Sequence, residues 1–165
     1  MSDPPPLHPA VEPLAGLLGV WRGEGRGSYP TIDAFDYGEE VVFGHVGKPF
    51  LAYRQRTWLR RDGAPLHAEA GYWRMVDDDA VEAVLSHPFG AAEVLAGTVI
   101  TRAPLALRLH SQQVVTTVTA KRIDAVERDV DANPVEGTLA YAVRMAAVGE
   151  PMTHHLAATL RRADG

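Results

Sequence analysis

Cysteine is absent from this chain of 165 residues. Without a thiol, the protein can form no disulfide bond, use no thiolate nucleophile and hold no zinc or haem iron on a cysteine thiolate. Motifs of common enzyme classes are missing as well, because the sequence contains no Ser-His-Asp motif, phosphate-binding loop, dinucleotide fingerprint or HExxH. Any metal centre must therefore use histidine or carboxylate ligands, and hydrolase, kinase and dehydrogenase functions have no support.

Long apolar runs and clusters of basic residues are also missing. No window approaches the ~18 apolar residues of a membrane-spanning helix. The N-terminal MSDPPPLHPAVEPL has neither the basic nor the apolar segment of a secretory signal. The formal net charge is −5, with acids and bases mixed along the chain, whereas nucleic-acid binding requires clustered Lys and Arg. We therefore expect a cytoplasmic protein that binds neither membranes nor nucleic acid.

Hydrophobic residues make up 46% of the chain and charged residues 22%, which is ordinary for a soluble globular protein. The length suits one domain with a sizeable core. The proline-rich residues 1–13 predict an extended, disordered lead, because proline removes backbone donors and fixes φ. We expect the domain to cover residues 14–163 and to begin with one short helical turn in LAGLLG.

After Gly19 the chain consists of short runs rich in Val, Thr, Tyr and Trp, separated by turn residues such as those in RDGAP and ANPVEG. About ten such runs precede a last one; together they cover residues 19–29, 37–46, 50–60, 66–75, 80–86, 91–100, 105–110, 113–120, 124–131, 137–147 and 153–162. This spacing predicts an all-β fold, a single antiparallel up-and-down barrel of about ten strands, with a sandwich as the alternative. Such a barrel is wide enough to hold one small ligand.

The first run, GVWRGEGRGSYP, has glycine at alternate positions. Because side chains alternate along a strand, one face carries only three glycines between Trp21 and Tyr29, while the other face is polar. Two interpretations are compatible. Glycine lets a barrel strand coil sharply, with Trp21 closing the barrel, or the bare face leaves space for a ligand.

The chain has seven histidines: His8, His45, His67, His87, His110, His154 and His155. A single histidine on a strand is more often structural or exposed than a ligand. In LHAEAGYW, His67 and Glu69 share one face of the expected strand. This pair could hold zinc, orient a bound ligand or only form a surface ion pair.

The histidine pair in PMTHHLAATLRR lies where the last strand leaves a turn, so one of the two must face inward. Alternation groups His154 with the apolar Leu156 and therefore favours His154 as the core residue. However, the small Thr153 and Ala157 leave room for a large planar group beside His155, and alternation is unreliable directly after a turn.

These segments resemble the nitrobindin family of haem-binding barrels, from about Leu14 to Arg162. The family signature G-x-W-x-G-x-G-x-G-x-Y-P is filled at every specified position, by Gly19, Trp21, Gly23, Gly25, Gly27, Tyr29 and Pro30. The later P-x-x-x-H-L pattern of the family is met by Pro151, His155 and Leu156. The match therefore includes both the first and the last expected strand of the chain.

The resemblance implies a ten-stranded barrel that holds one ferric haem b per chain through an axial histidine. The matching position is His155 and not His154, which overrides the argument from alternation. By the same resemblance Thr31 lines the haem and His67 lies on the pocket side. Lys121 and Arg128 match basic positions and are expected to face the haem propionates, with ordinary surface charge as the alternative.

The function that the resemblance implies is isomerisation of peroxynitrite to nitrate, together with reversible nitric oxide binding, at an iron with one open position. No catalytic residue beyond the haem ligand is required. Assembly as a homodimer is left open. Two other classes of function remain: a haem-free carrier of a fatty acid or similar apolar ligand, and a structural or interaction module whose interior is filled by side chains.

Overall fold

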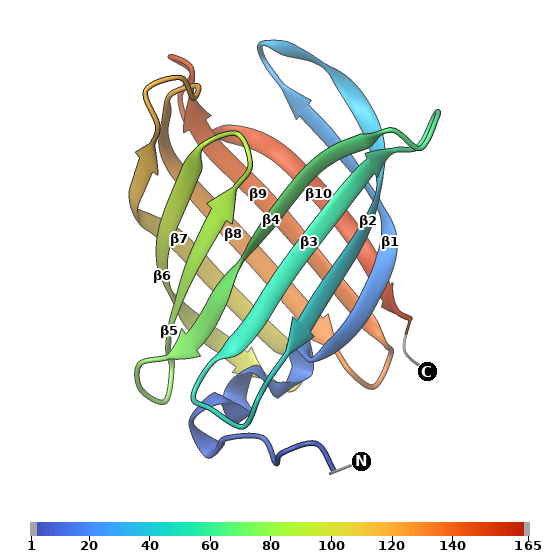
Figure 1. Ribbon diagram of the computed structural model, residues 1–165, viewed down its shortest axis with the longest axis vertical. Helices are drawn as coiled ribbons and strands as arrows, with labels where there is room; N and C mark the ends of the chain where they lie inside the picture. The colour runs from blue at the N-terminus through green and yellow to red at the C-terminus, as the bar shows by residue number, and fades with distance from the viewer. Residues whose placement is uncertain (1–2, 164–165) are drawn as a thin grey trace.

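The computed structural model describes residues 3–163 and is drawn in Figure 1. Within this range the chain forms a 3₁₀ helix, η1, and ten β-strands. Their bounds are η1 Pro9–Leu17, β1 Gly19–Tyr29, β2 Ile32–Gly44, β3 Leu51–Leu59, β4 Pro65–Met75, β5 Ala80–His87, β6 Ala91–Arg102, β7 Leu105–Thr116, β8 Ile123–Asn133, β9 Thr138–Ala147 and β10 Thr153–Arg162. In the described part of the chain, no helix has the length and apolar character needed to cross a membrane.

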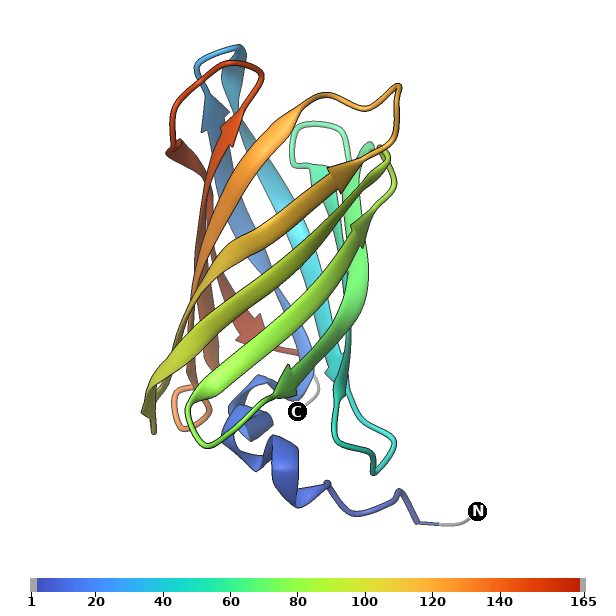
Figure 2. The same cartoon turned by 90° about the vertical axis from the view of Figure 1, so that its left-hand side faces the viewer.

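The strands close into one antiparallel barrel, because β1 pairs both with β2 and with β10, the last strand. This closure confirms the predicted up-and-down barrel and rules out the alternative, a sandwich. Successive strands run in opposite directions, so their connections alternate between two ends (Figure 2). We call the end next to η1 the lower end, and the end that carries the β1–β2 and β9–β10 connections the upper end.

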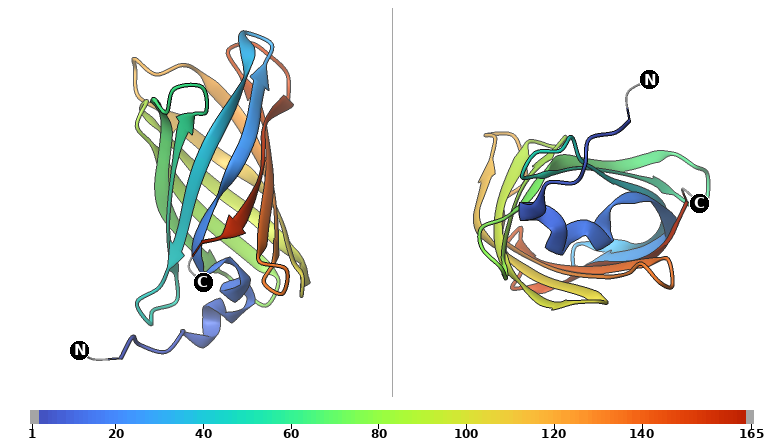
Figure 3. Two further views of the ribbon diagram at one scale, coloured as in Figure 1. Left: turned by 90° about the vertical axis from the view of Figure 1, so that its right-hand side faces the viewer. Right: turned by 90° about the horizontal axis from the view of Figure 1, so that it is seen from below.

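The lower end is closed by η1, which lies across it when the barrel is seen from below (Figure 3). Three apolar side chains of the helix, those of Val11, Leu14 and Leu17, have no exposed surface. Trp21 of β1 is also fully buried, and its Nε1 donates a hydrogen bond of 2.8 Å to the carbonyl oxygen of Leu17. Trp21 and the helix together therefore fill the lower mouth of the barrel.

The helix confirms the short helical element expected near the N-terminus, but it begins earlier than LAGLLG. It starts at Pro9, within the lead expected to be disordered, and His8 caps it by accepting a hydrogen bond from the amide of Ala10. Proline at the first helical positions removes no needed hydrogen bond and already has a suitable φ. Residues 1 and 2 of that lead lie outside the described residues.

The glycine face of β1 is covered by its neighbours and is not bare. The ring of Tyr37 lies over Gly25 and the ring of Phe35 lies over Gly27, so closely that a Cβ at either glycine would overlap the ring. Both aromatic residues stand on β2, directly opposite the glycine that each covers. The alternating glycines therefore make room for side chains of the adjacent strand and leave no ligand space there.

The two runs expected at 105–110 and 113–120 belong to one strand, β7. Ser111 pairs with Leu95, but Gln113 already pairs with Val94, so Gln112 is an extra residue in the ladder. Such a β-bulge shifts the alternation of side chains by one position. The sequence pattern breaks there as it would at a turn, although the strand continues.

Candidate functional site

A second β-bulge determines which histidine of β10 faces the interior. His154 pairs with Arg144 and Leu156 pairs with the next residue, Val143, so His155 is the extra residue. As a result, His154 is exposed, while Leu156 packs against the core and His155 is half-buried. Alternation favoured His154 because the sequence does not show the bulge.

The imidazole of His155 is held by two groups of β1. Its Nδ1 lies 3.1 Å from the carbonyl oxygen of Ser28, and its ring meets that of Tyr29 edge-on at 5.4 Å between centroids. A carbonyl oxygen only accepts hydrogen bonds, so Nδ1 carries the proton and Nε2 keeps its lone pair. Burial lowers the pKa of His155, only partly offset by the hydrogen bond to Ser28, and this favours the neutral ring.

Tyr29 fixes the wall of the barrel beside this histidine. Its hydroxyl accepts a hydrogen bond from the amide of Ala147 at 3.0 Å, and the carbonyl oxygens of Met145 and Ala147 lie within donating distance, at 3.1 and 3.3 Å. The hydroxyl therefore joins the upper end of β1 to that of β9, with β10 between them. This contact gives the motif tyrosine a role that the sequence pattern did not reveal.

A neutral imidazole with one nitrogen held by a backbone carbonyl is the usual form of a histidine that binds a metal. His155 meets this requirement, so the donor atom that a haem iron needs is present. Two other residues of the expected haem site lie at the same end of the barrel: Thr31 is exposed in the β1–β2 connection and Lys121 is exposed in the β7–β8 connection. Their contacts with haem remain predictions.

Arg128 lies inside the barrel, where it was not expected. Its side chain is 10% exposed and contacts the carboxylates of Glu69 and Glu93 with four donor–acceptor distances between 2.8 and 3.2 Å. It is therefore not surface charge, and a haem propionate would have to displace one of these two partners. In the structure Arg128 is the ion-pair partner of two buried acids, and its contact with a haem propionate stays a prediction.

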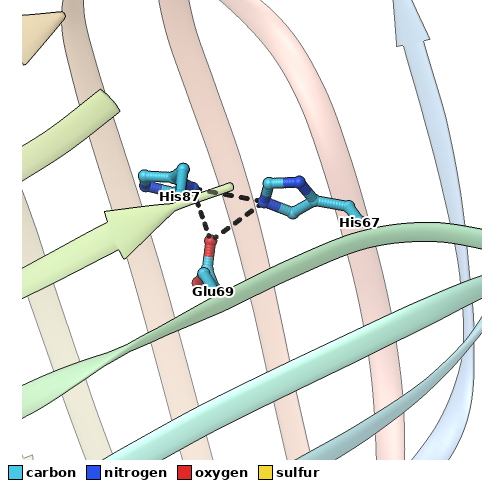
Figure 4. Close-up of side chains that lie close together, drawn as sticks. All are labelled: His67, Glu69 and His87. Atoms are coloured by element: carbon cyan, nitrogen blue, oxygen red, sulfur yellow. Dashed lines mark hydrogen bonds and ion pairs between the residues drawn. The ribbon is translucent and has the colours of Figure 1, made fainter. Parts of the chain in front are cut away.

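The same network holds His67, the other histidine expected on the pocket side (Figure 4). Its Nε2 lies 3.2 Å from Nδ1 of His87, and Oε2 of Glu69 lies 3.7 Å from His67 and 3.5 Å from His87. Although burial alone would raise the pKa of the Glu69 carboxyl, the Arg128 guanidinium holds it well below its usual range. The surface-pair interpretation of His67 and Glu69 is wrong, because Glu69 is buried.

His87 and Glu93 were missed as parts of this cluster. The signal for His87 was present, since the alternation of Val81, Ala83 and Leu85 along β5 places it on the inward face. What the sequence could not show is the closure of the barrel, which brings β4, β5, β6 and β8 around one point.

A separate acidic group lies deeper in the barrel. Glu39 is fully buried and accepts hydrogen bonds from the hydroxyl of Tyr141 at 2.7 Å and from Nε2 of Gln55 at 2.5 Å. Burial is the main cause that raises the pKa of Glu39 to about 7, and the charge of Glu69 adds to it. The interior therefore contains both ionised carboxylates beside Arg128 and one that takes up a proton near neutrality.

Known proteins resemble this chain over nearly its whole length. Residues 10–162 match the family model described as a THAP4-like, heme-binding beta-barrel domain. A protein of Nocardia farcinica named peroxynitrite isomerase is 48% identical, with 98% of each chain covered. A protein of Arabidopsis thaliana that bears the same activity in its name is 43% identical over 96% of this chain and 92% of its own. The crystal structure of Rv2717c from M. tuberculosis superposes with a TM-score of 0.91 at 44% identity, covering 95% of this chain and 99% of that one.

Proposed function

Because this chain belongs to the THAP4-like haem-binding β-barrel family, the nitrobindin family, we propose that it binds haem through His155 and isomerises peroxynitrite to nitrate. The observation that carries the proposal is the state of His155: a half-buried, neutral imidazole whose Nδ1 is held by Ser28 and whose Nε2 keeps its lone pair. The names of the relatives from Nocardia farcinica and Arabidopsis thaliana support the activity.

The reaction asks little of the protein's own side chains. Peroxynitrite and nitrate have the same atoms and the same charge, so no proton, electron or second substrate is needed. Haem, when bound, would supply an iron with a position open to a small anion or gas. We propose ferric haem b, one per chain, and reversible binding of nitric oxide at that same position.

The residues near the upper end have separate tasks in this proposal. His155 would hold the haem iron, and the Ser28 carbonyl, 3.1 Å from Nδ1, would fix the orientation of its ring and raise its basicity. Tyr29 keeps the wall beside the ring in place through the backbone of β9. Thr31, His67 and Lys121 are proposed to contact the haem, with the Lys121 ammonium toward a propionate.

The test is reconstitution with ferric hemin, followed by removal of excess hemin and measurement of the haem absorption band and of nitrate formed from peroxynitrite. We expect His155→Ala to lose haem retention and activity while its circular dichroism stays that of the barrel, because the bond to iron involves one side chain. His154→Ala is the matched control and should keep both. Wild-type haem absorbance in His155→Ala, or its loss only in His154→Ala, would contradict the assignment.

The interior of the barrel does not favour the fatty-acid carrier. A carrier of this kind needs a cation for the ligand's carboxylate and apolar space for its chain. Here the buried cation, Arg128, already binds two glutamates. If the protein takes up no added hemin, the haem function is contradicted, and an apolar-ligand carrier or a structural module remains as its function.

A further inference from the structure

His67, Glu69 and His87 form a group that we call the His-Glu triad, shown in Figure 4. They come from β4 and β5, which are adjacent in the barrel, and each points one ligand atom at the other two. These atoms, Nε2 of His67, Nδ1 of His87 and Oε2 of Glu69, all lie within 4.8 Å of one another. The triad is distinct from His155, which stands on β10.

The size of the triad is that of one face of a tetrahedral metal site. Its three edges measure 3.2, 3.5 and 3.7 Å. A zinc ion with bonds of about 2.0–2.2 Å to nitrogen and oxygen has neighbouring ligand atoms about 3.3–3.6 Å apart in tetrahedral geometry. A point equidistant from the three atoms therefore lies about 2 Å from each, which is the length of such a bond.

Surrounding groups hold two of the three ligands as they are held in metalloproteins. The second ring nitrogen of His87, Nε2, lies 2.7 Å from Oε1 of Glu93. A ligating histidine usually has a carboxylate or carbonyl at its other nitrogen, which fixes the ring and increases its basicity. Glu69 is oriented through Oε1, which accepts hydrogen bonds from Tyr53 at 2.6 Å and from Arg128 at 2.8 Å, while its ligand oxygen Oε2 also accepts one from Arg128 at 3.2 Å.

Charge and access also suit a cation. Glu69 and Glu93 carry two negative charges against the single positive charge of Arg128, so the cluster keeps a net negative charge when its histidines are neutral. Glu69 and His87 are almost fully buried, with side chains 4% and 5% exposed, whereas His67 is 29% exposed. An ion would reach the triad past His67 and then lie largely out of water.

We propose that the His-Glu triad binds one divalent transition-metal ion of the zinc class. Two imidazoles and one carboxylate are a ligand set for Zn²⁺, and Co²⁺ and Cu²⁺ accept the same donors. In the absence of an ion, a proton shared between Nε2 of His67 and Nδ1 of His87 accounts for their distance of 3.2 Å. The metal site goes beyond the haem function and shares only His67 with the residues proposed to contact haem.

The experiment uses the full chain without haem, and Co²⁺ as the probe because its visible absorption reports tetrahedral coordination; Zn²⁺ is then added in competition. We expect one ion per chain, bound with d–d bands of a tetrahedral site and displaced by Zn²⁺. His67→Ala and His87→Ala should each weaken binding at least tenfold. His110→Ala and His154→Ala remove exposed histidines and should bind as the wild type does.

A second variant probes the carboxylate behind His87. Glu93→Gln keeps the shape of the side chain but weakens its hold on the ring, and loss of such a partner typically lowers metal affinity about 10–100-fold. Circular dichroism and thermal unfolding check that each variant is folded. If Glu93→Gln or His87→Ala does not fold, His67→Ala decides the question, since its side chain is the most exposed of the three ligands.

The variant His155→Ala separates this proposal from the haem function. It should lose hemin yet bind Co²⁺ with unchanged affinity, whereas His87→Ala should lose Co²⁺ yet retain hemin. The proposal is overturned if wild-type protein binds no Co²⁺, if His67→Ala and His87→Ala both bind it normally, or if only His155→Ala abolishes binding.

Discussion

The two ends of the barrel are built from opposite kinds of residue. At the lower end, the buried side chains of η1 and Trp21 form an apolar plug, and the indole nitrogen of Trp21 is hydrogen-bonded to Leu17. The upper part instead gathers His67, His87 and His155, with ionised carboxylates beneath them. The contrast shows that closure of the barrel and its chemistry are separated. Because the helix seals one end, the other can keep ionisable groups within reach of water.

Trp21→Ala should produce the largest loss of stability. Removing a large, fully buried aromatic side chain costs about 3–5 kcal/mol, and Trp21 also anchors η1 through Leu17. We expect the urea midpoint to fall accordingly, while the protein that remains folded binds hemin with unchanged affinity. Tyr72→Ala, at a site 59% exposed, is the control and should cost little. A matching loss of hemin affinity in folded Trp21→Ala would break the separation between the two ends.

Glu39→Gln should remove a pH dependence of the protein's stability. This dependence comes from the Glu39 carboxyl, which is buried inside the barrel between its two ends. In the folded protein burial raises the pKa of Glu39 to about 7, against 4.5 for an exposed glutamate, so Glu39 holds its proton up to that pH. Its contribution to stability is therefore complete below pH 4.5 and is lost as the pH rises through about 7. The contribution of Glu39 to the free energy of unfolding amounts to roughly 3 kcal/mol.

Urea unfolding at pH 5 and pH 8 measures this effect as the difference between wild type and Glu39→Gln. The groups that face Glu39 are Gln55 and Tyr141. The charge of Glu69 raises the pKa of Glu39, and the charge of Arg128 lowers it. Glu136→Gln, at an exposed turn, is the matched control and should follow the wild type. If the stability of Glu39→Gln changed between pH 5 and pH 8 as much as that of the wild type, the Glu39 carboxyl would not hold the proton.

Tyr29→Phe should have the smallest effect on stability and should act at the upper end. It removes the hydroxyl that joins β1 to the backbone of β9, at a cost of about 1–2 kcal/mol. The ring remains beside His155, so hemin should still bind but dissociate faster. Tyr72→Phe is the control. A loss of stability as large as that of Trp21→Ala would show that the upper end also closes the barrel.

The barrel could be predicted from the sequence because alternation and turn residues are local signals. The site could be predicted only in part. His154 and His155 differ in direction because of a bulge that no residue type announces. Arg128 did carry a signal, since it alternates with the buried Val126 and Val130 on β8. Its partners Glu69 and Glu93 lie far away in sequence and meet it only when the barrel closes.

The sequence pattern predicts the helix at the lower end but not its early start. The prolines of the lead suggest disorder, yet Pro9 suits the first turn of a helix, and Val11 and Leu14 carry the apolar pattern that buries it. A segment poor in backbone donors can still be ordered when its side chains fill a cavity that the rest of the chain leaves.

The contacts of Arg128 also bear on the mechanics of the barrel. Its guanidinium reaches from β8 to Glu69 on β4 and Glu93 on β6, so one side chain links three strands that are not neighbours in the barrel. Hydrogen bonds in the wall of a cylinder resist stretching along its circumference but allow it to flatten into an oval. Ion pairs between non-adjacent strands on the inside of the barrel oppose this flattening. We therefore expect the barrel to keep its cross-section at the level of Arg128 before and after a guest molecule enters.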